Sequence, residues 1–598
     1  MRTSVLFCLL LFFAWGTAQA QFITHGPIIG AVAPNTARVY LRTHTAQAFE
    51  LEYSTDPNFG TLQTLSAATE ANRDSATVLN LSGLNPNTEY FMRFRFGGTL
   101  DSITGSFRTF PTPGDRQPFT LATGSCQETE NMNVFREIPN HDPLLFIHLG
   151  DWTYPSYQLP DDRYPEDWEY VALSYRRRYE EVNMREMLHH LPVDYVYDDD
   201  DFTEGGSVRD FYTRVEQVDD NGTNRNLIIN TPVPDSVRKN CIAGYTTFFP
   251  HYPLVDTAEG IFHSYRVGNA EVFFCDIRGT QTPLDGALAY DTLNNEWRWE
   301  PQPGHTLLRQ AQFEWLKQGL LNSDADWKII ATGAVFNRGY RSFIRAGLDW
   351  QNTTIGDFNG FQLVAGFTGE WAGYPESDSL MAFLEANEIT DVVAISGQSH
   401  VNMVDDGTNA GIPELNASGL SVAENDKLLM SGLQLLPGFL GFPSVLDSLW
   451  NGGGTGIGQG VGNQNNGFGK LEFFGNDSLR LSVIDENGAV MGEVMLLHSS
   501  KVVTRPEEQL AEQQVLKVVY PSPATDVVRI QFQKGYQPAT EDRIRVSNLA
   551  GQTLLEIPIT PHRNTGLQQI DVSQWPAGVY QLGFITRHGF YNRKIVVE

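Results

Sequence analysis

The chain has 598 residues, which is too long for one domain of ~100–200 residues. Its 71 acidic and 42 basic side chains give a formal net charge of −29, so a general affinity for nucleic acid or anionic lipid is not expected. Solubility in a salty exterior is the simplest explanation of this acidity. An acidic protein can still bind phosphate esters, because a bound multivalent cation inverts the local field.

The first 20 residues have the pattern of a secretory signal peptide. Arg2 precedes an apolar core over 5–15, and Ala18-Gln19-Ala20 is typical of a cleavage site. No later stretch of the sequence has enough uninterrupted apolar residues to span a bilayer. We therefore predict cleavage after Ala20 and an exported, soluble protein without a transmembrane segment.

Residues 21–113 have the pattern of an all-β sandwich. Turn-rich segments separate short alternating runs, which lie at 36–41, 49–53, 76–81 and 90–94. The stretch 84–90, LNPNTEY, resembles the tyrosine corner of fibronectin type III domains. Residues 112–115 then predict a short linker. Two roles are open for this domain, a spacer or a cover over the active site, and neither is catalytic.

Residues 119–154 are the stretch around which the main domain is organised. Apolar runs at 119–122 and 144–149 predict two strands, and 130–138 has apolar residues at helical spacing. Two strands joined by a helix within ~30 residues predict a βαβ unit with parallel strands. Both strands then end at one edge of the sheet, where open α/β sheets bind ligands. The candidate site residues at this edge are Cys126, Asp151 and Tyr154.

Two further strand-like runs end in polar residues in the same way. The run 193–197 leads into four aspartates at 198–201, and the run 391–396 leads to His400. A thiolate, a phenolate and a carboxylate together suit trivalent iron, whereas the aspartates offer hard oxygen ligands and His400 suits either kind of site. Packing alone does not explain four strands that each end in metal-ligand side chains.

Strands alternate with helical patterns across 117–500, which predicts an α/β domain with a two-layered αββα core. The helical pattern over 161–190 contains three arginines at 176–178. Guanidinium groups match phosphate oxygens, although such a run is also typical of a solvated helix face. We keep Arg178 as the candidate substrate-binding residue. Residues 203–245, rich in Asp, Asn and Gly, predict a loop near the site.

Three cysteines remain after removal of Cys8 with the signal peptide. This odd number in an oxidising compartment is consistent with a disulfide between Cys241 and Cys275 and a metal-bound thiolate at Cys126. Three buried thiols are the alternative. The sequence does not give the separation of these residues, which decides whether a disulfide forms.

The segment 452–514 predicts a loop, two strands and a linker. Glycines dominate 452–469, which is therefore expected to be a flexible loop. Strand patterns return at 470–474 and 479–484 and are expected to complete the second sheet. Residues 501–514 are polar and rich in glutamine and glutamate, as in a linker.

Residues 515–598 predict a small β domain. Its segments YPSPA (520–524), LAG (549–551) and PAGVY (576–580), with Lys594 near the end, resemble the type A sorting domain of type IX secretion. That resemblance implies an outer-membrane secretion machinery as partner, and a secreted or cell-surface location. A carbohydrate- or surface-binding β module is the alternative.

Six blocks in the main domain resemble the PhoD-type alkaline phosphatases, which have the calcineurin-like metallophosphoesterase fold. The blocks are GSCQ (124–127), GDWTY (150–154), YDDDDF (197–202), the segment 307–333, EWAGYP (370–375) and ISGQSH (395–400). They cover roughly 117–500 in the family's order. The cysteine together with the Asp-x-x-Tyr pair is the most specific part of the resemblance.

The resemblance implies a metal cluster and a hydrolytic reaction. Iron (Fe3+) and calcium are the implied cofactors, and other divalent metals are alternatives. The implied metal ligands are Cys126, Asp151, Tyr154, Asp198, Asp199 and His400. The implied catalytic residues are Asp151, Asp200 and His400. The reaction would be hydrolysis of a small phosphate monoester or diester by metal-bound hydroxide.

The chain departs from the family pattern at two positions. The family's third block reads Trp-Asp-Asp-His-Asp/Glu, so Asp200 replaces a histidine, and its fourth reads Gly-Asp-x-His, so Gln398 replaces an aspartate. One change adds a negative charge and the other removes one, so the two can compensate. We expect weak phosphomonoesterase activity that depends strongly on added divalent metal. Two alternatives are a non-catalytic phosphate- or calcium-binding protein of this fold and an adhesin that displays an inert core.

Overall fold

The computed structural model describes most of the chain. The described residues are 21–128, 133–154, 165–202, 208–220, 223–291, 293–294, 296–350, 369–422, 449–454, 466–500, 515–520, 524–533, 536–540, 542–548, 553–561, 566–586 and 589–597. The predicted signal peptide, the linker 501–514 and part of the glycine-rich loop lie outside them. Two compact units divide the chain, Met1–His498 and Ser499–Glu598, and each is described by itself.

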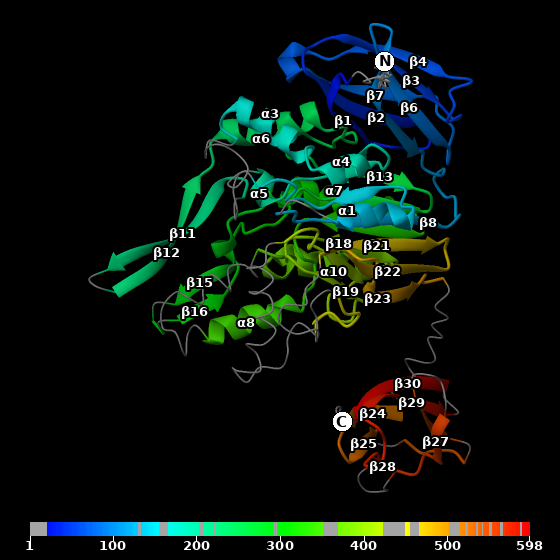
Figure 1. Cartoon of the computed structure of the whole chain (residues 1–598). Helices are drawn as coiled ribbons and strands as arrows, with labels where there is room; N and C mark the ends of the chain where they lie inside the picture. Colours follow the sequence, from blue (N-terminus) through cyan, green and yellow to red (C-terminus); the bar gives the residue numbers. More distant parts are fainter. Residues whose placement is uncertain are drawn as a thin grey trace, which may run out of the picture. The chain divides into compact units, whose positions relative to one another are not determined.

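The first unit begins with a seven-stranded β-sandwich (Figure 1). One sheet has the order β1-β2-β5 and the other the order β4-β3-β6-β7. The elements are β1 (Ile23–Gly30), β2 (Thr36–Thr43), β3 (Ala48–Ser54), β4 (Gln63–Ala68), η1 (Ala71–Arg73), β5 (Ala76–Ser82), β6 (Glu89–Phe96) and β7 (Thr99–Arg108). The backbone N–H of Asn85 donates to the Tyr90 hydroxyl at 2.9 Å, which forms the predicted tyrosine corner. The predicted sandwich is confirmed.

Two six-stranded sheets form the centre of the first unit, in the orders β10-β9-β8-β21-β22-β23 and β13-β14-β17-β18-β20-β19. The strands of the first sheet are β8 (Phe119–Gly124), β9 (Phe146–His148), β10 (Val193–Tyr195), β21 (Gly467–Phe474), β22 (Ser478–Asp485) and β23 (Val490–Leu497). Those of the second are β13 (His263–Val267), β14 (Ala270–Phe274), β17 (Trp327–Thr332), β18 (Val392–Ser396), β19 (Asn402–Asp405) and β20 (Glu414–Ala417). Since β21 begins at Gly467, the last glycines of the predicted loop belong to a strand.

The strands that lead to the predicted site residues are parallel. β8 pairs with β9, and β9 pairs with β10, in parallel register. Between β8 and β9 lie α1 (Val134–Glu137) and η2 (Ile138–His141), so the predicted βαβ order is confirmed. In the second sheet, β14, β17, β18 and β20 are parallel neighbours. The ends of β8, β9 and β10 therefore meet at one edge, as expected from the sequence.

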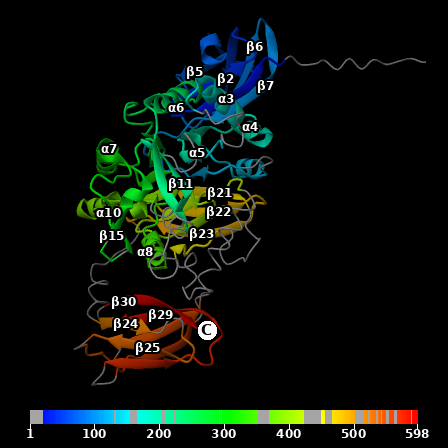
Figure 2. The ribbon, with the colours of Figure 1, turned by 90° about the vertical axis from the view of Figure 1, so that its left-hand side faces the viewer.

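Alternation along the central strands produces the layers. Ile329 and Ile395 contribute to the hydrophobic cluster shared with the first sheet, whereas Ile330 and Ala394 pack with the helices on the other face. The helices on that face are α7 (Arg309–Asn322) and α10 (Pro375–Ala386). Figure 2 shows them on one side of the core, with β21–β23 on the other. The predicted αββα core is confirmed.

The prediction of a loop over 203–245 is wrong. Strands β11 (Phe211–Asp220) and β12 (Thr223–Pro232) form an antiparallel ladder, and α6 (Asp235–Phe248) follows. Asn221-Gly222 between the strands is the dipeptide signal of a tight hairpin. The predicted helical region contains α3 (Trp168–Arg178) and α4 (Val182–Leu188). The remaining elements are α5 (Asp199–Phe202), η3 (Leu284–Ala287), β15 (Leu288–Asp291), β16 (Glu296–Trp299), α8 (Tyr340–Trp350) and η5 (Trp371–Gly373).

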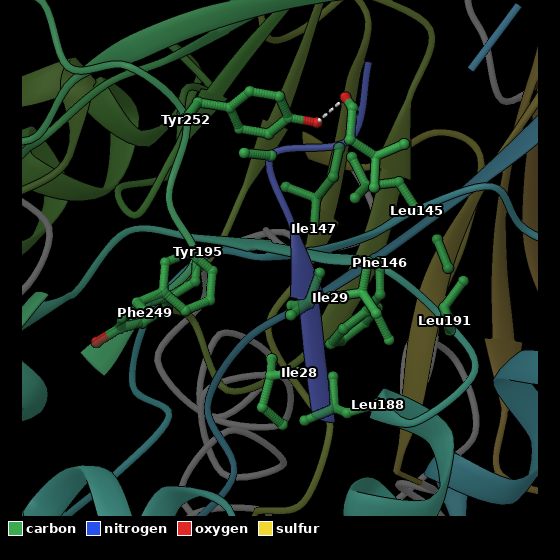
Figure 3. Packing of buried hydrophobic residues seen from close by; sticks show 14 of the residues in the cluster. Ile28, Ile29, Leu145, Phe146, Ile147, Leu188, Leu191, Tyr195, Phe249 and Tyr252 are labelled. Carbon is green, nitrogen blue, oxygen red and sulfur yellow. Dashed lines mark hydrogen bonds between the residues drawn. The ribbon is translucent and has the colours of Figure 1, made fainter. Parts of the chain in front are cut away.

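The N-terminal sandwich shares its hydrophobic core with the central sheets. Figure 3 shows Ile28 and Ile29 of β1 among side chains from β9, α4 and the segments beside them, and all of these belong to one buried cluster. The Tyr252 hydroxyl donates to the Val32 carbonyl at 2.8 Å (Figure 3). A Cβ at Gly30 would lie 2.5 Å from the Pro250 carbonyl oxygen, so β1 needs glycine at this close approach. This packing does not fit the role of a free spacer.

The second unit is a smaller β-sandwich with its own core. Its sheets have the orders β24-β25-β28 and β27-β26-β29-β30, and Val528, Ile530, Ile544 and Leu582 are fully buried between them. The strands are β24 (Leu516–Tyr520), β25 (Val527–Phe532), β26 (Arg543–Asn548), β27 (Thr553–Pro558), β28 (Leu567–Asp571), β29 (Gly578–Thr586) and β30 (Gly589–Val597). In the part of the chain that the structure describes, no helix is long and apolar enough to cross a membrane.

Candidate metal centre

The predicted ligands follow β8, β9, β10 and β18, at the carboxyl ends of these strands. Cys126, Asp151, Gln398 and His400 all have a positive φ, of 59°, 54°, 67° and 57°. Non-glycine residues rarely adopt this conformation, and such residues cluster at functional sites. At Gly150, where φ is 103°, a Cβ would lie 2.4 Å from the Asp198 Cβ. The loop after β9 can therefore approach the aspartate run only with glycine at this position.

The first group of potential ligands combines sulfur, oxygen and nitrogen. One ligand atom each from Cys126, Asp151 and His400 lies within 4.8 Å of the others. Asp151 Oδ2 lies 3.6 Å from Cys126 Sγ and 3.5 Å from the Tyr154 hydroxyl oxygen. The structure thus brings these four predicted residues together. A thiolate, a carboxylate, an imidazole and a phenolate at these distances suit a transition metal.

The second group consists of oxygen ligands. Carboxylate oxygens of Asp151, Asp199 and Asp200 lie within 4.8 Å of one another, and the backbone N–H of Asp200 donates to Asp151 Oδ1 at 3.3 Å. Asp151 belongs to both groups, so its two oxygens are available to two neighbouring cations. Asp200 and His400 are the half-buried members and Asp151 is buried, so the site opens toward solvent on their side.

The electrostatics of the site are those of a cluster that needs positive charge. Burial, and then the charges of Asp199 and Cys126, raise the pKa of Asp151 well above its usual range. Burial and then Asp199 raise the pKa of Asp200 to about 8, and burial raises that of Cys126 to about 12. Burial also raises the pKa of Tyr154. A bound cation stabilises the ionised form of each of these groups.

Two orphaned oxygens also fit a metal cluster. Asp198 Oδ2 and Gln398 Oε1 are buried and have no hydrogen-bond partner among the residues that the structure describes. A buried polar atom without a partner is costly. The backbone of Gln398 opposes the rise in the pKa of Cys126 that burial causes, so Gln398 lies beside the first group. The donor set therefore fits cations on both sides of Asp151.

Asp198 lies outside both ligand groups of the described residues, although we predicted it as a ligand. Its Oδ1 is paired with Nε of Arg278, and Nη2 of Arg278 lies 3.5 Å from Asp199 Oδ1. Burial raises the pKa of Asp198 to about 7, although Arg278 opposes this shift. Sequence reasoning missed Arg278. It follows β14, so the strand-end rule that identified the other residues would have found it.

The assignment of Arg178 to substrate binding is wrong. Its side chain is buried, and its Nη2 donates to Asp201 Oδ1 at 3.0 Å and to Thr153 Oγ1 at 2.9 Å. The guanidinium carbon lies 4.2 Å from the centre of the Tyr175 ring. Because the side chain is enclosed by protein groups and paired with a carboxylate, it is not placed to clamp a phosphate from solvent.

The predicted disulfide is also wrong, because Cys241 and Cys275 are both free and buried. Cys241 lies on α6 and donates to the Phe202 carbonyl at 2.6 Å. It packs in the cluster shared with the first sheet, whereas Cys275 follows β14 and packs in the cluster under α7. The odd number of cysteines predicted a pair, but the two thiols belong to different layers of the domain.

Ser418 was not predicted at the site, and Asp201 was predicted only as a member of the aspartate run. Ser418 follows β20, and its Oγ lies 3.2 Å from Cys126 Sγ and accepts the His400 backbone N–H at 2.9 Å. Asp201 accepts backbone N–H groups from the loop after β9. For Ser418 the end of a parallel strand is the only signal in the sequence, and for Asp201 the aspartate run gives no signal that distinguishes it from its neighbours.

The chain is similar to known proteins in sequence and in fold. Alkaline phosphatase D of Bacillus subtilis (strain 168) is 24% identical over 347 residues, which cover 54% of this chain and 52% of that protein. The chain thus spans about half the length of this curated relative. A solved structure of PhoD matches with a TM-score of 0.53 and 15% identity, over 79% of this chain and 88% of that one. This likeness shows the fold. A purple acid phosphatase structure from yellow lupin matches with a TM-score of 0.48 and 13% identity, over 79% of this chain and 74% of that one.

Three family models match successive parts of the chain. Residues 14–111 match the PhoD-like phosphatase N-terminal domain, and residues 518–598 match the secretion system C-terminal sorting domain. Residues 121–424, half of the chain, match the PhoD-like phosphatase model. This range holds every ligand of the centre built around Asp151, and the chain therefore belongs to the PhoD-like phosphatase family.

Proposed function

We propose that the protein is an exported, metal-dependent hydrolase of phosphate monoesters or diesters. The observation that carries this proposal is the position of Asp151, which belongs both to a sulfur-, nitrogen- and oxygen-containing group and to a group of carboxylates. Two cations on either side of one carboxylate are the arrangement expected for hydrolysis of phosphate esters. The family of the chain supports this activity.

Iron and calcium are the metals that we propose for the two groups. Cys126, Asp151, Tyr154 and His400 would hold the iron, and Asp151, Asp199 and Asp200 would hold the calcium. Other divalent metals also suit the carboxylates. When bound, such cations hold the phosphoryl oxygens, lower the pKa of a coordinated water and stabilise the leaving oxygen.

The chain's own residues would orient the ester and balance part of the negative charge of the site. Arg278 pairs with Asp198 and Asp199, so that part of the aspartate charge is balanced before a substrate dianion enters. Asp200 and His400 are half-buried, which supports the approach of a phosphate ester from their side. His400 is held through its backbone by Ser418, and we propose that it faces the phosphoryl group or its metal.

The replacement of a histidine by Asp200 favours a ligand role for this residue. Its carboxylate lies in the group with Asp151 and Asp199, and an ionised aspartate cannot donate a proton to a leaving oxygen. General acid help of that kind contributes about 10²–10⁴-fold in rate. We therefore propose weak turnover that increases with added divalent metal. Gln398 removes one negative charge beside Cys126 and offsets the charge that Asp200 adds.

One combined experiment tests this function. The protein is purified without added metal, analysed for iron and calcium, and assayed with p-nitrophenyl phosphate and bis-p-nitrophenyl phosphate. Asp151→Asn should remove both metals. It should also lower activity by more than about 10–100-fold, the effect that is typical when a residue only supports a ligand. Asp378→Asn, which changes an exposed ion pair on α10, is the control and should have little effect.

Tyr154→Phe sharpens the assignment of iron. A phenolate bound to iron(III) absorbs visible light, so the wild-type protein should be coloured and the variant should lose this band. A colourless protein without metals that still hydrolyses both esters would contradict the proposal. Bound metals without turnover of either ester would instead support a non-catalytic phosphate- or calcium-binding protein of this fold.

Export is the last part of the proposal. The match of residues 518–598 to a secretion system sorting domain supports the outer-membrane machinery of type IX secretion as the partner of the second unit. Together with the predicted signal peptide, this match supports a location at the cell surface or outside the cell, where the enzyme would act on small phosphate esters.

A further inference from the structure

Asp201 accepts backbone hydrogen bonds from two loops of the candidate metal centre. Its Oδ2 accepts the backbone N–H groups of Asp151 at 2.8 Å and Asp198 at 2.9 Å. Its Oδ1 accepts those of Trp152 at 2.8 Å and Thr153 at 3.0 Å. The side chain of Asp201 is fully buried. One carboxylate therefore ties the loop after β9 to the loop after β10.

Arg178 holds this carboxylate from the other side. Its Nη2 donates to Asp201 Oδ1 at 3.0 Å and to Thr153 Oγ1 at 2.9 Å. The rings of Tyr175 and Tyr195 enclose the guanidinium, with centres 4.2 and 4.8 Å from its central carbon. Both partners of the ion pair are shielded from water, so the pair is screened little by salt and its geometry is restricted by packing.

The cost of burying this pair calls for a role beyond stability. Two charges removed from water lose their hydration, and an apolar pair of similar size is often at least as stabilising. Besides its pairing with Arg178, Asp201 accepts backbone N–H groups from two ligand loops, one of which carries Asp151 in a left-handed conformation. Groups that orient a metal ligand from behind often determine its affinity for metal.

We propose that Asp201, held by Arg178, is the positioning residue that sets Asp151 between its two ligand groups. The inference rests on the proposed function, since it assumes that Asp151 binds metal. Neither Asp201 nor Arg178 touches the substrate in this account. Their effect is exerted through the backbone of residues 151–153, and it should therefore be visible in metal binding as well as in turnover.

Two variants that change the local charge in opposite directions test the proposal. Asp201→Asn removes a negative charge near the cations, whereas Arg178→Met removes a positive one. If the pair acted only through its electric field, the first change would weaken cation binding and the second would strengthen it. If the pair positions Asp151, both changes should weaken retention of iron and calcium about 10–100-fold.

Asp194→Asn is the matched control. Asp194 is also fully buried and is paired at 3.0 Å with the imidazole of His263, but it lies within β10, and in the described part of the chain its hydrogen bonds go to neither ligand loop. The three variants are reconstituted with iron and calcium, dialysed against a chelator and analysed for metal, with thermal unfolding of the metal-free proteins measured in parallel. Asp194→Asn should lower the unfolding temperature but retain metal as the wild type does.

Activity provides a second readout. With metal in excess, Asp201→Asn and Arg178→Met should lower kcat for p-nitrophenyl phosphate and leave KM within about twofold, because the bridging ligand is displaced and the substrate contacts remain. Opposite changes in metal retention, or equal metal loss in Asp194→Asn, would overturn the proposal. If Asp201→Asn does not fold, Arg178→Met decides alone, since tighter or unchanged metal binding contradicts positioning. A wild type that binds metal without turnover would refute the hydrolase and leave this test intact.

Discussion

Two β-sandwiches precede and follow, in the sequence, the domain of residues 117–498 that holds the candidate metal centre, called here the metal domain. They differ in how their strands are buried. Every residue of β1 in the N-terminal sandwich is buried except Thr24, whereas β25 in the C-terminal sandwich alternates buried and half-buried residues. A strand covered on one face alternates, and a strand covered on both faces does not. β1 therefore packs on its own sandwich and on the metal domain, while the second unit is built around its own core.

This difference indicates two kinds of attachment. The N-terminal sandwich belongs to the folding unit that holds Asp151 and its partners, so its loss should reach the metal centre. The C-terminal sandwich has a separate core, so its loss should be tolerated by the first unit. The fold therefore separates a domain needed for stability from one that we propose to be needed for export.

Deletion of 21–111 should have the largest effect, the loss of soluble protein. It would expose the apolar side chains on which β1 packs, among them Leu145, Leu188 and Leu191 (Figure 3), and exposed patches of this kind cause aggregation. Soluble yield, far-UV circular dichroism and metal content measure the outcome. A soluble fragment with wild-type metal content would show that the sandwich is only attached to the domain.

How far these conclusions follow from the sequence depends on how far apart the interacting residues lie along the chain. The alternating runs and strand ends are local patterns, and they predicted both sheets and the meeting of Cys126, Asp151, Tyr154 and His400. The contact between β1 and the metal domain joins segments distant in sequence, and the proline and glycine at 112–115 indicated only a linker. The packing of β1 could therefore be learned only from the structure.

The errors at the site have the same origin. Arg178 and Asp201 are partners from separate elements, so the arginine run at 176–178 could not reveal that one guanidinium is buried against a carboxylate. The four aspartates of the run have identical side chains, and the direction in which each side chain points depends on the turn of α5. The odd number of cysteines likewise carries no information on the layers that separate Cys241 from Cys275.

A point substitution in the shared core should have the next largest effect. Ile29→Ala removes a fully buried side chain of β1, and such truncations cost about 2–5 kcal/mol of unfolding free energy. We expect it to destabilise the whole first unit, sandwich and metal domain together. Thermal unfolding and the temperature dependence of phosphatase activity should shift in parallel.

Ile530→Ala is the matched control for this change. Ile530 of β25 is also fully buried, but in the core of the second unit. The variant should lower the unfolding temperature of that unit alone and leave the temperature dependence of activity unchanged. If Ile530→Ala also destabilised the metal centre, or if Ile29→Ala left it unaffected, the contrast between the two sandwiches would be wrong.

Tyr252→Phe should have a smaller effect. The Tyr252 hydroxyl donates to the Val32 carbonyl across the contact between the sandwich and the metal domain. Removing it deletes one hydrogen bond and no apolar packing, which costs about 1 kcal/mol. Chemical denaturation should show a lower midpoint with an unchanged slope. An effect as large as that of Ile29→Ala would mean that this hydrogen bond, rather than the apolar cluster, holds the two parts together.

Deletion of 515–598 should have the smallest effect on the metal domain. The second unit has its own hydrophobic core, so its removal should leave the unfolding temperature, the metal content and the kcat of the first unit unchanged. Its effect should appear in location instead, because residues 518–598 match a secretion sorting domain. In the native host, cell fractionation should then find active enzyme retained in the periplasm and absent from the medium and cell surface. Loss of soluble, active protein on this truncation would show that the second unit stabilises the first, and unchanged export would remove the basis for its proposed role.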